Sequence, residues 1–552
     1  MNDDKRTDET TRDGEQLVTK SESVGPDRRS VLKAGGLAGV AGVLGEMELV
    51  KRVAGQTEPT DAAHTTQAQG GVTADAIDEG FANVVNVVDA GGDPTGNQSV
   101  TPVLRNVAAD NTLIKFPQGR YKMDGGLRFT GFDKFGMVGT DATIAPTTDD
   151  EFSGYYCFKL GVEGDEGGLL LFQGFDYDLT PNNTGEKAIE TYVTDSLWAS
   201  DITINGRHDT PSESGGTFAV TDPSGYGFVE RFVFPNGTSA VFNSEGNQKG
   251  GRSGITVPYA SLGTMCFRDC VINRCHDNGM YTKGGGGKIV VRGGTYTNSC
   301  VSNIRIAGRD SEIRNARVSV YKNPSGFYNQ TGIRVDGGSN VLLKNVRMKF
   351  RQPNGPGIEV YDEVESLNVL DTNIVYSNKP AVGISIAPNT GTTRISNVDI
   401  TYTDENTGDA AILLKGGGQT ADYAYVSDVT VTGPATGDTP FYQEAIVAFR
   451  DHTEFRNVTL EQNGPGNRQG ITVLGDDCLV ADCDLSATLH PLIVQGVNQR
   501  VDTNTLESDS GAAGLLITSS AADVDVVKNT VHGGIYDSGA TDVVRIANTY
   551  PS

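Results

Sequence analysis

The stretch GITVPY at residues 254–259 decides the fold, because variants of it recur at regular intervals along the chain. They include NIRIAG at 303–308, GIRVDG at 332–337, GIEVYD at 357–362 and GITVLG at 470–475. Ten such steps cover 260 positions, a mean period of 26 residues, which is the period of a solenoid. Within each variant apolar and variable residues alternate, which predicts a short strand with one buried face.

A second phrase, apolar-x-Asn/Asp-x-x-apolar, follows the first in most coils, as in LKNVRM at 343–348 and ISNVDI at 395–400. Its third position holds, in chain order, Asp269, Asn315, Asn345, Asp371, Asn397, Asp428, Asn457 and Asp482. Asn and Asp tolerate left-handed backbone angles and hydrogen-bond their own chain. This recurring residue therefore predicts a sharp bend between two strands of each coil.

Two or three short strands per coil, β-branched interiors and no helical period predict an all-β fold, a right-handed parallel β-helix with coils about 4.8 Å apart. A leucine-rich repeat would need its Leu-rich signature, and a propeller would need a period of roughly 40–50 residues. The chain shows neither. On these phrases the sequence resembles the pectin-lyase-like superfamily, and the resemblance leaves the catalytic family open.

The region before the repeat resembles the amino-terminal cap of the same superfamily. It reads as a strand, an acidic Gly-rich loop and a short helix expected over 101–109, followed by LIKFPQGRYKM at 113–123. Such a cap covers strand edges and apolar stack that the first coil would otherwise expose. We divide the chain into a signal region with a leader (1–57), a linker (58–80), the cap and first coils (81–150), loosely repeated coils (151–251) and the regular β-helix (252–552).

An export signal is predicted near the start of the chain. The segment DRRSVLK at 27–33 precedes a Gly/Ala/Leu/Val run at 34–45. Paired arginines before a weakly apolar run resemble a twin-arginine signal, and the run is shorter than the roughly 20 residues that span a bilayer. We therefore expect an extracellular or cell-surface protein without a transmembrane segment.

The composition is strongly acidic, with 70 Asp and Glu against 45 Lys and Arg and a net charge of −25. This balance resembles the solvated surfaces of haloarchaeal proteins, and it argues against nucleic acid or an anionic membrane as a partner. A groove for an anionic substrate would have to concentrate positive charge locally or recruit a cation. A single elongated domain of this kind is expected to be a monomer.

Seven cysteines allow two interpretations. Cys275 and Cys300 are one coil apart, so stacked coils would bring them within disulfide range, and export would permit the bond. Stacked buried thiols explain the same spacing. No paired C-x-x-C motif points to a metal site.

The candidate site follows from the strand pattern. The third and fifth residues of each first-strand phrase should point outward, and stacked coils align them on one face. Ionisable and phenolic groups fill this face over four coils, and the outward positions of later coils hold mostly small or apolar residues. The crowded positions are Tyr281, Lys283, Arg305, Arg334, Asp336, Glu359 and Tyr361.

These residue types suit an acidic polysaccharide. Lys283, Arg305 and Arg334 form a basic strip that fits carboxylate or sulfate groups. Asp336 and Glu359 are expected about 8 Å apart, because coils lie about 4.8 Å apart and alternate outward residues about 6.8 Å apart.

Two chemistries fit that spacing. The two carboxylates leave room for a water, as in inverting glycoside hydrolysis. Alternatively, Asp336 and Glu359 bind Ca²⁺, Lys283 or an arginine takes the proton next to a uronate carboxyl group, and Tyr281 or Tyr361 protonates the leaving oxygen.

Three residues are expected at the rim of this face. His276 and Asp277 in RCHDNG form either an acid/base pair or a solvated turn, with Asp277 and Arg309 as further substrate contacts. The cluster as a whole also fits a second interpretation, an exposed salt-bridge ladder that stabilises the sheet.

One short motif suggests a hydrolase. GDDC at 475–478 resembles the paired-aspartate motif of polygalacturonase-type glycoside hydrolases, which implies acid and base roles for Asp476 and Asp477. The other motifs of that family are missing, and His490 is followed by Pro491, so a coil turn explains these four residues equally well.

We therefore expect a secreted enzyme that cleaves a uronate-type polysaccharide by β-elimination or hydrolysis. The alternative is a non-catalytic adhesion protein that binds glycan on the same face.

Overall fold

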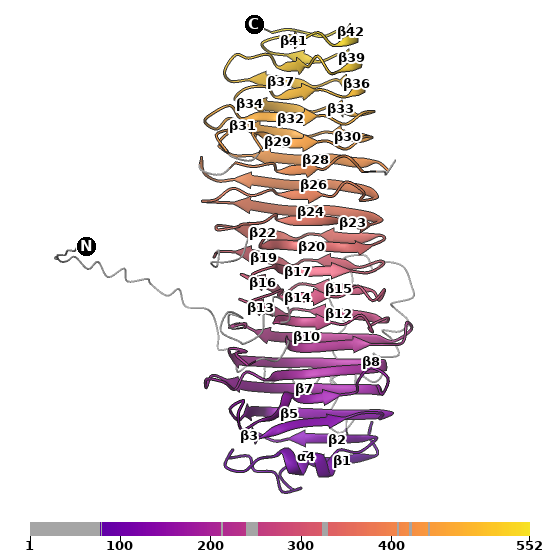
Figure 1. Cartoon of the computed structure of the whole chain (residues 1–552), viewed down its shortest axis with the longest axis vertical. Coiled ribbons are helices and arrows are strands. Elements are labelled where there is room, and N and C mark those ends of the chain that lie inside the picture. Colours follow the sequence, from indigo (N-terminus) through magenta and orange to yellow (C-terminus); the bar gives the residue numbers. More distant parts are fainter. Residues whose placement is uncertain are drawn as a thin grey trace, which may run out of the picture. The chain divides into compact units, whose positions relative to one another are not determined.

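The computed structural model describes Asp78 and residues 80–551, except 211–213, 239–251, 323–328, 406–407, 419–421 and 440–441. The DRRSVLK segment lies outside the described residues. The described chain from Phe81 on is a right-handed parallel β-helix, as the repeat predicts, with coils stacked along one axis (Figure 1). Nearly every strand pairs in parallel with a strand of the next coil.

The front sheet contains the predicted first strands of the coils. Its members, in pairing order, are β4 (Gly125–Phe129), β6 (Ser153–Leu160), the first part of β8 (Lys187–Gly206), β9 (Ser214–Val220), β11 (Ser253–Val257), β14 (Met280–Thr282), β17 (Ser302–Ala307), β20 (Thr331–Gly338), β23 (Ile358–Val364), β25 (Ile384–Ile386), β27 (Ile412–Leu414), β29 (Glu444–Ala448), β32 (Gln469–Val473), β35 (Leu492–Val494), β38 (Leu515–Ile517) and β41 (Ile535–Asp537).

The second sheet contains the strands that lead to the Asn/Asp bend. They are β1 (Asn83–Asn86), β2 (Thr112–Phe116), β5 (Lys134–Pro146), β7 (Gly167–Leu179), β8, β10 (Tyr226–Phe234), β12 (Thr264–Arg268), β15 (Ile289–Arg292), β18 (Glu312–Arg314), β21 (Val341–Lys344), β24 (Ser366–Tyr376), β26 (Thr392–Tyr402), β28 (Ala424–Thr432), β30 (Thr453–Arg456), β33 (Leu479–Ala481), β36 (Val497–Asp502), β39 (Ala522–Val527) and β42 (Thr541–Ile546).

The third sheet follows the bend. It contains β3 (Gly119–Met123), β13 (Val271–Asn273), β16 (Thr295–Thr297), β19 (Arg317–Val320), β22 (Arg347–Phe350), β31 (Thr459–Gln462), β34 (Asp484–Ala487), β37 (Thr505–Ser508) and β40 (Thr530–Val531), and β5, β7, β8, β10, β24, β26 and β28 run through the bend into it.

The bend residues adopt the predicted conformation. All eight Asn and Asp residues of the second phrase have φ between 51° and 60°, in the left-handed region where a short polar side chain is tolerated. Neighbouring coils link these side chains, since Asn345 Nδ2 donates to Asn315 Oδ1 at 2.7 Å and Asn397 Nδ2 to Asp371 Oδ1 at 2.7 Å. The bend is therefore both a local backbone choice and a ladder along the solenoid.

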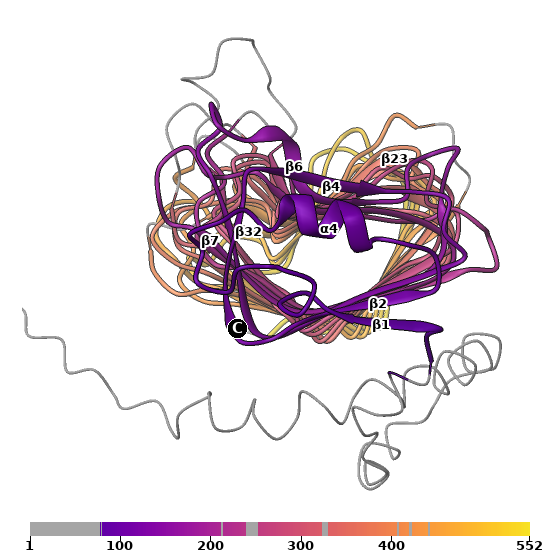
Figure 2. The same ribbon diagram turned by 90° about the horizontal axis from the view of Figure 1, so that it is seen from below.

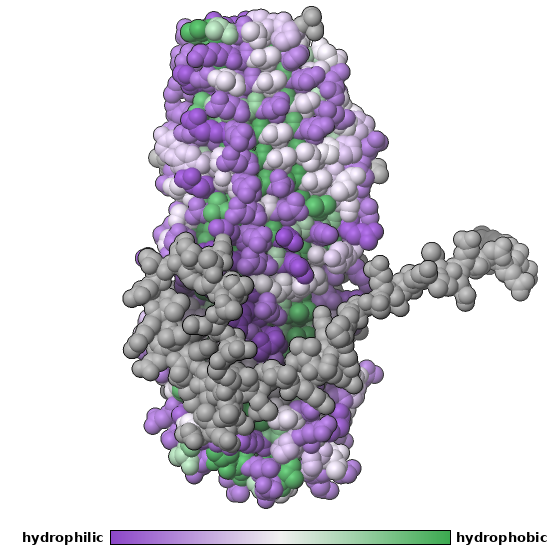
Figure 3. All heavy atoms as spheres, turned by 180° about the vertical axis from the view of Figure 1, so that it is seen from behind, coloured by the Kyte–Doolittle hydropathy of each residue, from purple (hydrophilic) through white to green (hydrophobic). Residues whose placement is uncertain are grey.

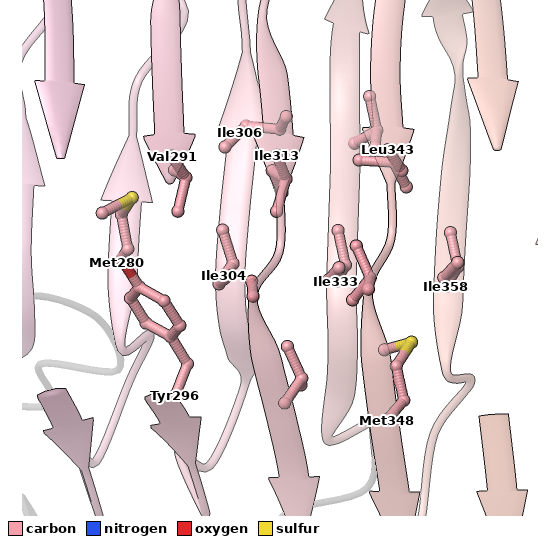
Figure 4. Close-up of a cluster of buried hydrophobic side chains, with 14 of the residues drawn as sticks. Met280, Val291, Tyr296, Ile304, Ile306, Ile313, Ile333, Leu343, Met348 and Ile358 are labelled. Atoms are coloured by element: carbon pink, nitrogen blue, oxygen red, sulfur yellow. The ribbon is translucent and has the colours of Figure 1, made fainter. Parts of the chain in front are cut away.

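The interior is a continuous stack of apolar side chains from successive coils. Ile304, Ile333 and Ile358 are in register on adjacent front-sheet strands, are fully buried and point into the core (Figure 4). Phe350 and Tyr376, two members of an aromatic column, stack with ring centroids 5.0 Å apart. On the face seen in Figure 3, hydrophilic residues cover most of the described surface and apolar residues form small separate groups.

Both ends of the solenoid are protected. The short helix α4 (Thr101–Val107) lies across the first coils beside β4 (Figure 2), close to where the cap helix was expected. At the other end Arg545 and Asp537 occupy positions in register with buried Val526 and Ile517 of the coil before, and they form an ion pair of 2.9 Å. Charges at inward positions make a strand edge a poor template for further pairing.

The seven cysteines are all buried and unbonded, which agrees with the stacked-thiol interpretation. Tyr177 is a core residue whose hydroxyl donates to the Ala188 carbonyl at 3.1 Å. Within the described residues no helix is long and apolar enough to cross a membrane.

Candidate functional site on the front sheet

The outward column of the front sheet brings most of the predicted residues together. Strand register places Tyr281 beside Arg305, Arg305 beside Arg334, and Arg334 beside Glu359. The inward neighbours that precede these residues are fully buried, namely Met280, Ile304, Ile333 and Ile358. The alternation that predicted the outward positions is therefore confirmed.

Asp336 is the centre of the cluster. Its Oδ2 accepts a hydrogen bond from Arg305 Nε at 2.6 Å, and its Oδ1 accepts one from Arg334 Nε at 2.5 Å. The three side chains are between 20% and 23% exposed. Such charge-assisted bonds are short and directional, so Asp336 fixes the positions of both guanidinium groups.

The backbone at Asp336 departs from the expected regular pairing. Register shifts between Ile306 and Ala307 on one side and between Val335 and Gly337 on the other, so Asp336 lies in a β-bulge. A bulge re-aims a side chain, and here it accompanies a carboxylate set between arginines of two coils. The regular grid that placed Asp336 about 8 Å from Glu359 does not apply.

Two tyrosines support the arginines. The Arg305 guanidinium lies 4.5 Å from the ring centroid of Tyr281, and the Arg334 guanidinium lies 4.0 Å from that of Tyr361. Cation–π contacts at such distances hold a guanidinium flat on the ring. Each ring therefore has one face covered by an arginine.

The protonation of these groups follows from their surroundings. Burial lowers the pKa of Arg334, but hydrogen bonding to Asp336 outweighs it, so the pKa is raised overall and the residue stays a cation. Burial, followed by the Glu359 carboxylate, raises the pKa of Tyr361, and burial raises the pKa of Tyr281. Both phenols therefore keep their protons at neutral pH.

Glu359 is the carboxylate with spare capacity. Its Oε2 accepts hydrogen bonds from Asn329 Nδ2 at 3.1 Å and from Thr331 Oγ1 at 3.2 Å, and Oε1 has no hydrogen-bond partner among the described residues. The Nη groups of Arg305 and Arg334 donate no hydrogen bond to a described residue. One carboxylate oxygen and two guanidinium edges are thus left for a ligand.

The remaining predicted residues lie at the margins. Lys283 lies at the edge of the cluster, with its Nζ 5.9 Å from the Tyr281 ring centroid. Asp277 is buried and accepts a hydrogen bond from Ser253 Oγ at 3.1 Å. His276 lies in the same turn, and its backbone N–H donates a hydrogen bond to Thr238 Oγ1. Burial, followed by the positive charge of Arg252, lowers the pKa of His276. Arg309 is exposed in the turn after β17.

The predicted calcium pair does not fit a cation as it is arranged. Both oxygens of Asp336 are occupied by arginine Nε donors, and two guanidinium groups would repel an ion placed there. Ca²⁺ takes six to eight oxygen ligands. In the part of the chain that the structure describes, no group of three or more His, Cys, Asp or Glu side chains is arranged to hold a metal.

The front sheet is closed beyond the cluster. Leu413 and Val447 continue the outward column of Glu359 but are only 4% and 2% exposed, because Val382 and Tyr442 pack over them. The bland stretch seen in the sequence is therefore a covered surface, and the open part of the column ends near Glu359.

Arg468 holds this cover in place. It is fully buried and donates hydrogen bonds to the carbonyls of Asp409 at 2.9 Å, Gln443 at 3.2 Å and Glu444 at 3.3 Å, and to Gln462 Oε1 at 2.9 Å. One guanidinium thus ties together the turns that precede β27 and β29.

The GDDC segment is a coil turn. Asp477 has φ of 55°, its Oδ1 accepts a hydrogen bond from Asn498 Nδ2 at 2.5 Å, and its Oδ2 lies 3.7 Å from His452 Nδ1. Asp476 Oδ1 accepts from the Val497 backbone N–H at 2.7 Å. These contacts join neighbouring turns, as the second interpretation of the motif proposed.

Two features escaped the sequence reasoning. Glu186 and Glu190 flank the start of β8, where Glu190 pairs with Lys159 and Lys187 at 2.6 Å each and Glu186 is fully buried. Burial, followed by Asp149, raises the pKa of Glu186 to about 8. The second feature is a line of cations on the second sheet, Arg268, Arg292, Arg314 and Lys344. The local excess of Lys and Arg in the sequence could have indicated it.

Comparison with known proteins shows the fold alone. No protein-family model matches the chain, and no curated protein matches its sequence. Solved right-handed parallel β-helix structures similar to it include the adhesin PfbA of Streptococcus pneumoniae (11% identity, 85% of this chain and 100% of that one, TM-score 0.31), a thermostable α-1,3-glucanase catalytic unit from Streptomyces thermodiastaticus (12%, 85% and 70%, 0.30) and an Escherichia coli bacteriophage tailspike in complex with a hexasaccharide (11%, 91% and 86%, 0.41). At such identities none of them assigns a residue role here.

Proposed function

We propose that this chain is an extracellular protein that binds an acidic polysaccharide over β14, β17, β20 and β23 and cleaves it by β-elimination. The observation that supports binding is the pair of guanidinium groups that Asp336 and two tyrosine rings hold in place. Their free Nη edges suit a carboxylate on the glycan. The chain as a whole carries a net charge of −25, so positive charge is not a general property of its surface.

Elimination is favoured over hydrolysis by the state of the carboxylates. Inverting hydrolysis needs two of them, and Asp336 is engaged by two arginines. In the proposed step Glu359 takes the proton next to the uronate carboxyl group, and the carbon–oxygen bond to the leaving sugar breaks as a carbon–carbon double bond forms. Tyr361 donates its proton to the leaving oxygen, and Arg305 and Arg334 neutralise the uronate carboxylate.

The test is a set of polysaccharides, polygalacturonate, alginate and a neutral glucan, given to the folded full-length protein. Absorbance of the unsaturated product and reducing ends are measured in parallel. We expect both to rise with a uronate polymer and neither with the glucan. Reducing ends without unsaturated product would contradict elimination and indicate hydrolysis.

Variants separate binding from chemistry. Glu359→Gln should abolish turnover while Kd changes less than threefold, and Arg334→Ala should weaken binding at least tenfold. Arg394→Ala is the matched control, because Arg394 also lies over a tyrosine, Tyr425 at 5.3 Å, but on the second sheet. Binding without turnover in the unaltered protein would favour the adhesion alternative. The absence of both binding and turnover would refute the proposal.

A further inference from the structure

A basic band interrupts this acidic protein. Residues 264–351 contain 15 Lys and Arg against five Asp and Glu, whereas the rest of the chain contains 30 against 65. Only four of these 15 cations belong to the outward column and rim of the front-sheet site, namely Lys283, Arg305, Arg309 and Arg334. Most of the excess charge therefore lies on other surfaces of the same coils.

Strand register aligns much of this charge at one corner of the solenoid. On the second sheet Arg268, Arg292, Arg314 and Lys344 occupy the same position in four successive coils. Coils are about 4.8 Å apart, so these cations form a line parallel to the solenoid axis.

The third sheet continues the charge on the other side of the Asn315 and Asn345 bend. Arg317 and Arg347 are in register on β19 and β22, and Lys349 lies two residues further along β22. All three are exposed, and none forms an ion pair with a described residue. We call the seven cations on the two sheets the basic corner.

Acidic partners exist. Lys344, at the end of the line, pairs with the exposed carboxylate of Asp371 at 3.7 Å, whereas the partners of the arginines lie beneath them. Glu312 pairs with Arg292 at 3.2 Å and with Arg314 at 2.5 Å, and its side chain is 10% exposed against 52% for Arg292. Glu230 pairs with Arg268, with exposures of 6% and 46%. The carboxylates thus orient the guanidinium groups, and the outer surface presents positive charge.

From this arrangement we infer that the basic corner is a second binding surface, separate from the front-sheet site, for a polyanionic polysaccharide. A line of cations suits a polymer whose charges repeat along its length. The flat faces offer no helix or ribbon to enter a nucleic-acid groove. An anchored polymer would hold the protein on its substrate or on a charged cell-surface layer.

The test is the triple variant Arg317→Glu/Arg347→Glu/Lys349→Glu, with Arg317→Gln/Arg347→Gln/Lys349→Gln as a milder second set. The matched control reverses three cations outside the band, Lys122→Glu/Arg128→Glu/Lys379→Glu. All are made in the Arg305→Ala/Arg334→Ala background, so that the front-sheet site does not contribute. Binding to immobilised polygalacturonate is measured from low to high salt, with an oligodeoxynucleotide and dextran as comparison ligands.

We expect salt-sensitive binding that the charge-reversal triple weakens at least tenfold and the control leaves within twofold. A second readout is the fluorescence of Trp198, the only tryptophan of the chain. Its ring packs at a tilt against Phe228 with centroids 4.5 Å apart, and the Arg268 guanidinium lies 4.8 Å from the Phe228 centroid. Polymer at the Arg268 end should change this fluorescence, and Arg268→Ala should abolish the change.

Three results would overturn the inference. The first is equal binding by the charge-reversal triple, the control triple and the protein with an unaltered basic corner. The second is tighter binding of the oligodeoxynucleotide than of polygalacturonate. The third is the absence of salt-sensitive binding to either polyanion. None of these results depends on turnover or on the front-sheet arginines, so they leave the proposed activity to be judged by its own assay.

Discussion

Replacing Gly332 with alanine tests why GIRVDG and most of the other first-strand phrases begin with glycine. A Cβ at Gly332 would lie 2.5 Å from the Gly357 carbonyl oxygen, 2.6 Å from Met348 Cε and 2.7 Å from Phe350 Cζ. The methionine can move aside, but the carbonyl belongs to the backbone of the next coil. Overpacking of this kind costs about 1–3 kcal/mol. Alanine restores about 0.4–1 kcal/mol by restricting the unfolded chain, which leaves a net loss of about 1–2 kcal/mol.

The assay is urea unfolding followed by circular dichroism and fluorescence. The matched control is Gly337→Ala in the same strand, where a Cβ would meet no atom closer than 3.3 Å. We expect the control within about 0.5 kcal/mol of the unaltered protein and a clearly lower urea midpoint for Gly332→Ala. Equal midpoints for the two variants would show that interior crowding does not set the glycine at this position.

Three further predictions concern other parts of the solenoid. Arg468→Ala should lower stability by about 3 kcal/mol or more, because several buried carbonyls lose their donor. Arg500→Ala, which removes an exposed pair with Asp502, should leave thermal unfolding almost unchanged. Equal losses for the two variants would contradict the cover role of Arg468. Glu186 has its pKa raised from 4.5 to about 8, so the stability linked to its protonation is full below pH 4.5 and is lost as pH rises through about 8. Glu186→Gln should therefore be relatively more stable at pH 9 than at pH 5, and melting curves that shift in parallel at both pH values would count against this. Asn345→Ala should cost about 1 kcal/mol and Asn345→Gly less, since φ is 52° there; the reverse order in urea unfolding would show that the side-chain bond to Asn315 outweighs the backbone angle.

The fold could be predicted because its signals are local and repeated. Alternation marks one buried face per strand, and a bend residue recurs near Asn315 and Asn345 with the left-handed φ that its chemistry favours. The long strands β7 and β8 were harder to see, since the phrase is weak there and pairing with neighbouring coils sets their extent.

The residues of the site were predictable, but their arrangement was not. Alternation placed Arg305, Arg334 and Glu359 on one outward face, which the register confirms. It could not show that a bulge sets Asp336 between two arginines, or that this engages the carboxylate expected to act with Glu359. A bulge depends on the strands on both sides, and those contacts are about 25 to 30 residues away in sequence.

The coil, its bends and the outward column follow from the sequence alone, because each depends on residue type at a fixed local spacing. The charge excess of residues 264–351 is also visible in the sequence, but without a position on the surface. The line of Arg268, Arg292 and Arg314, the cover over Leu413 and the free oxygen of Glu359 arise only when the coils stack. Each of these depends on how one coil is stacked on the next, and stacking register is a property of the folded chain.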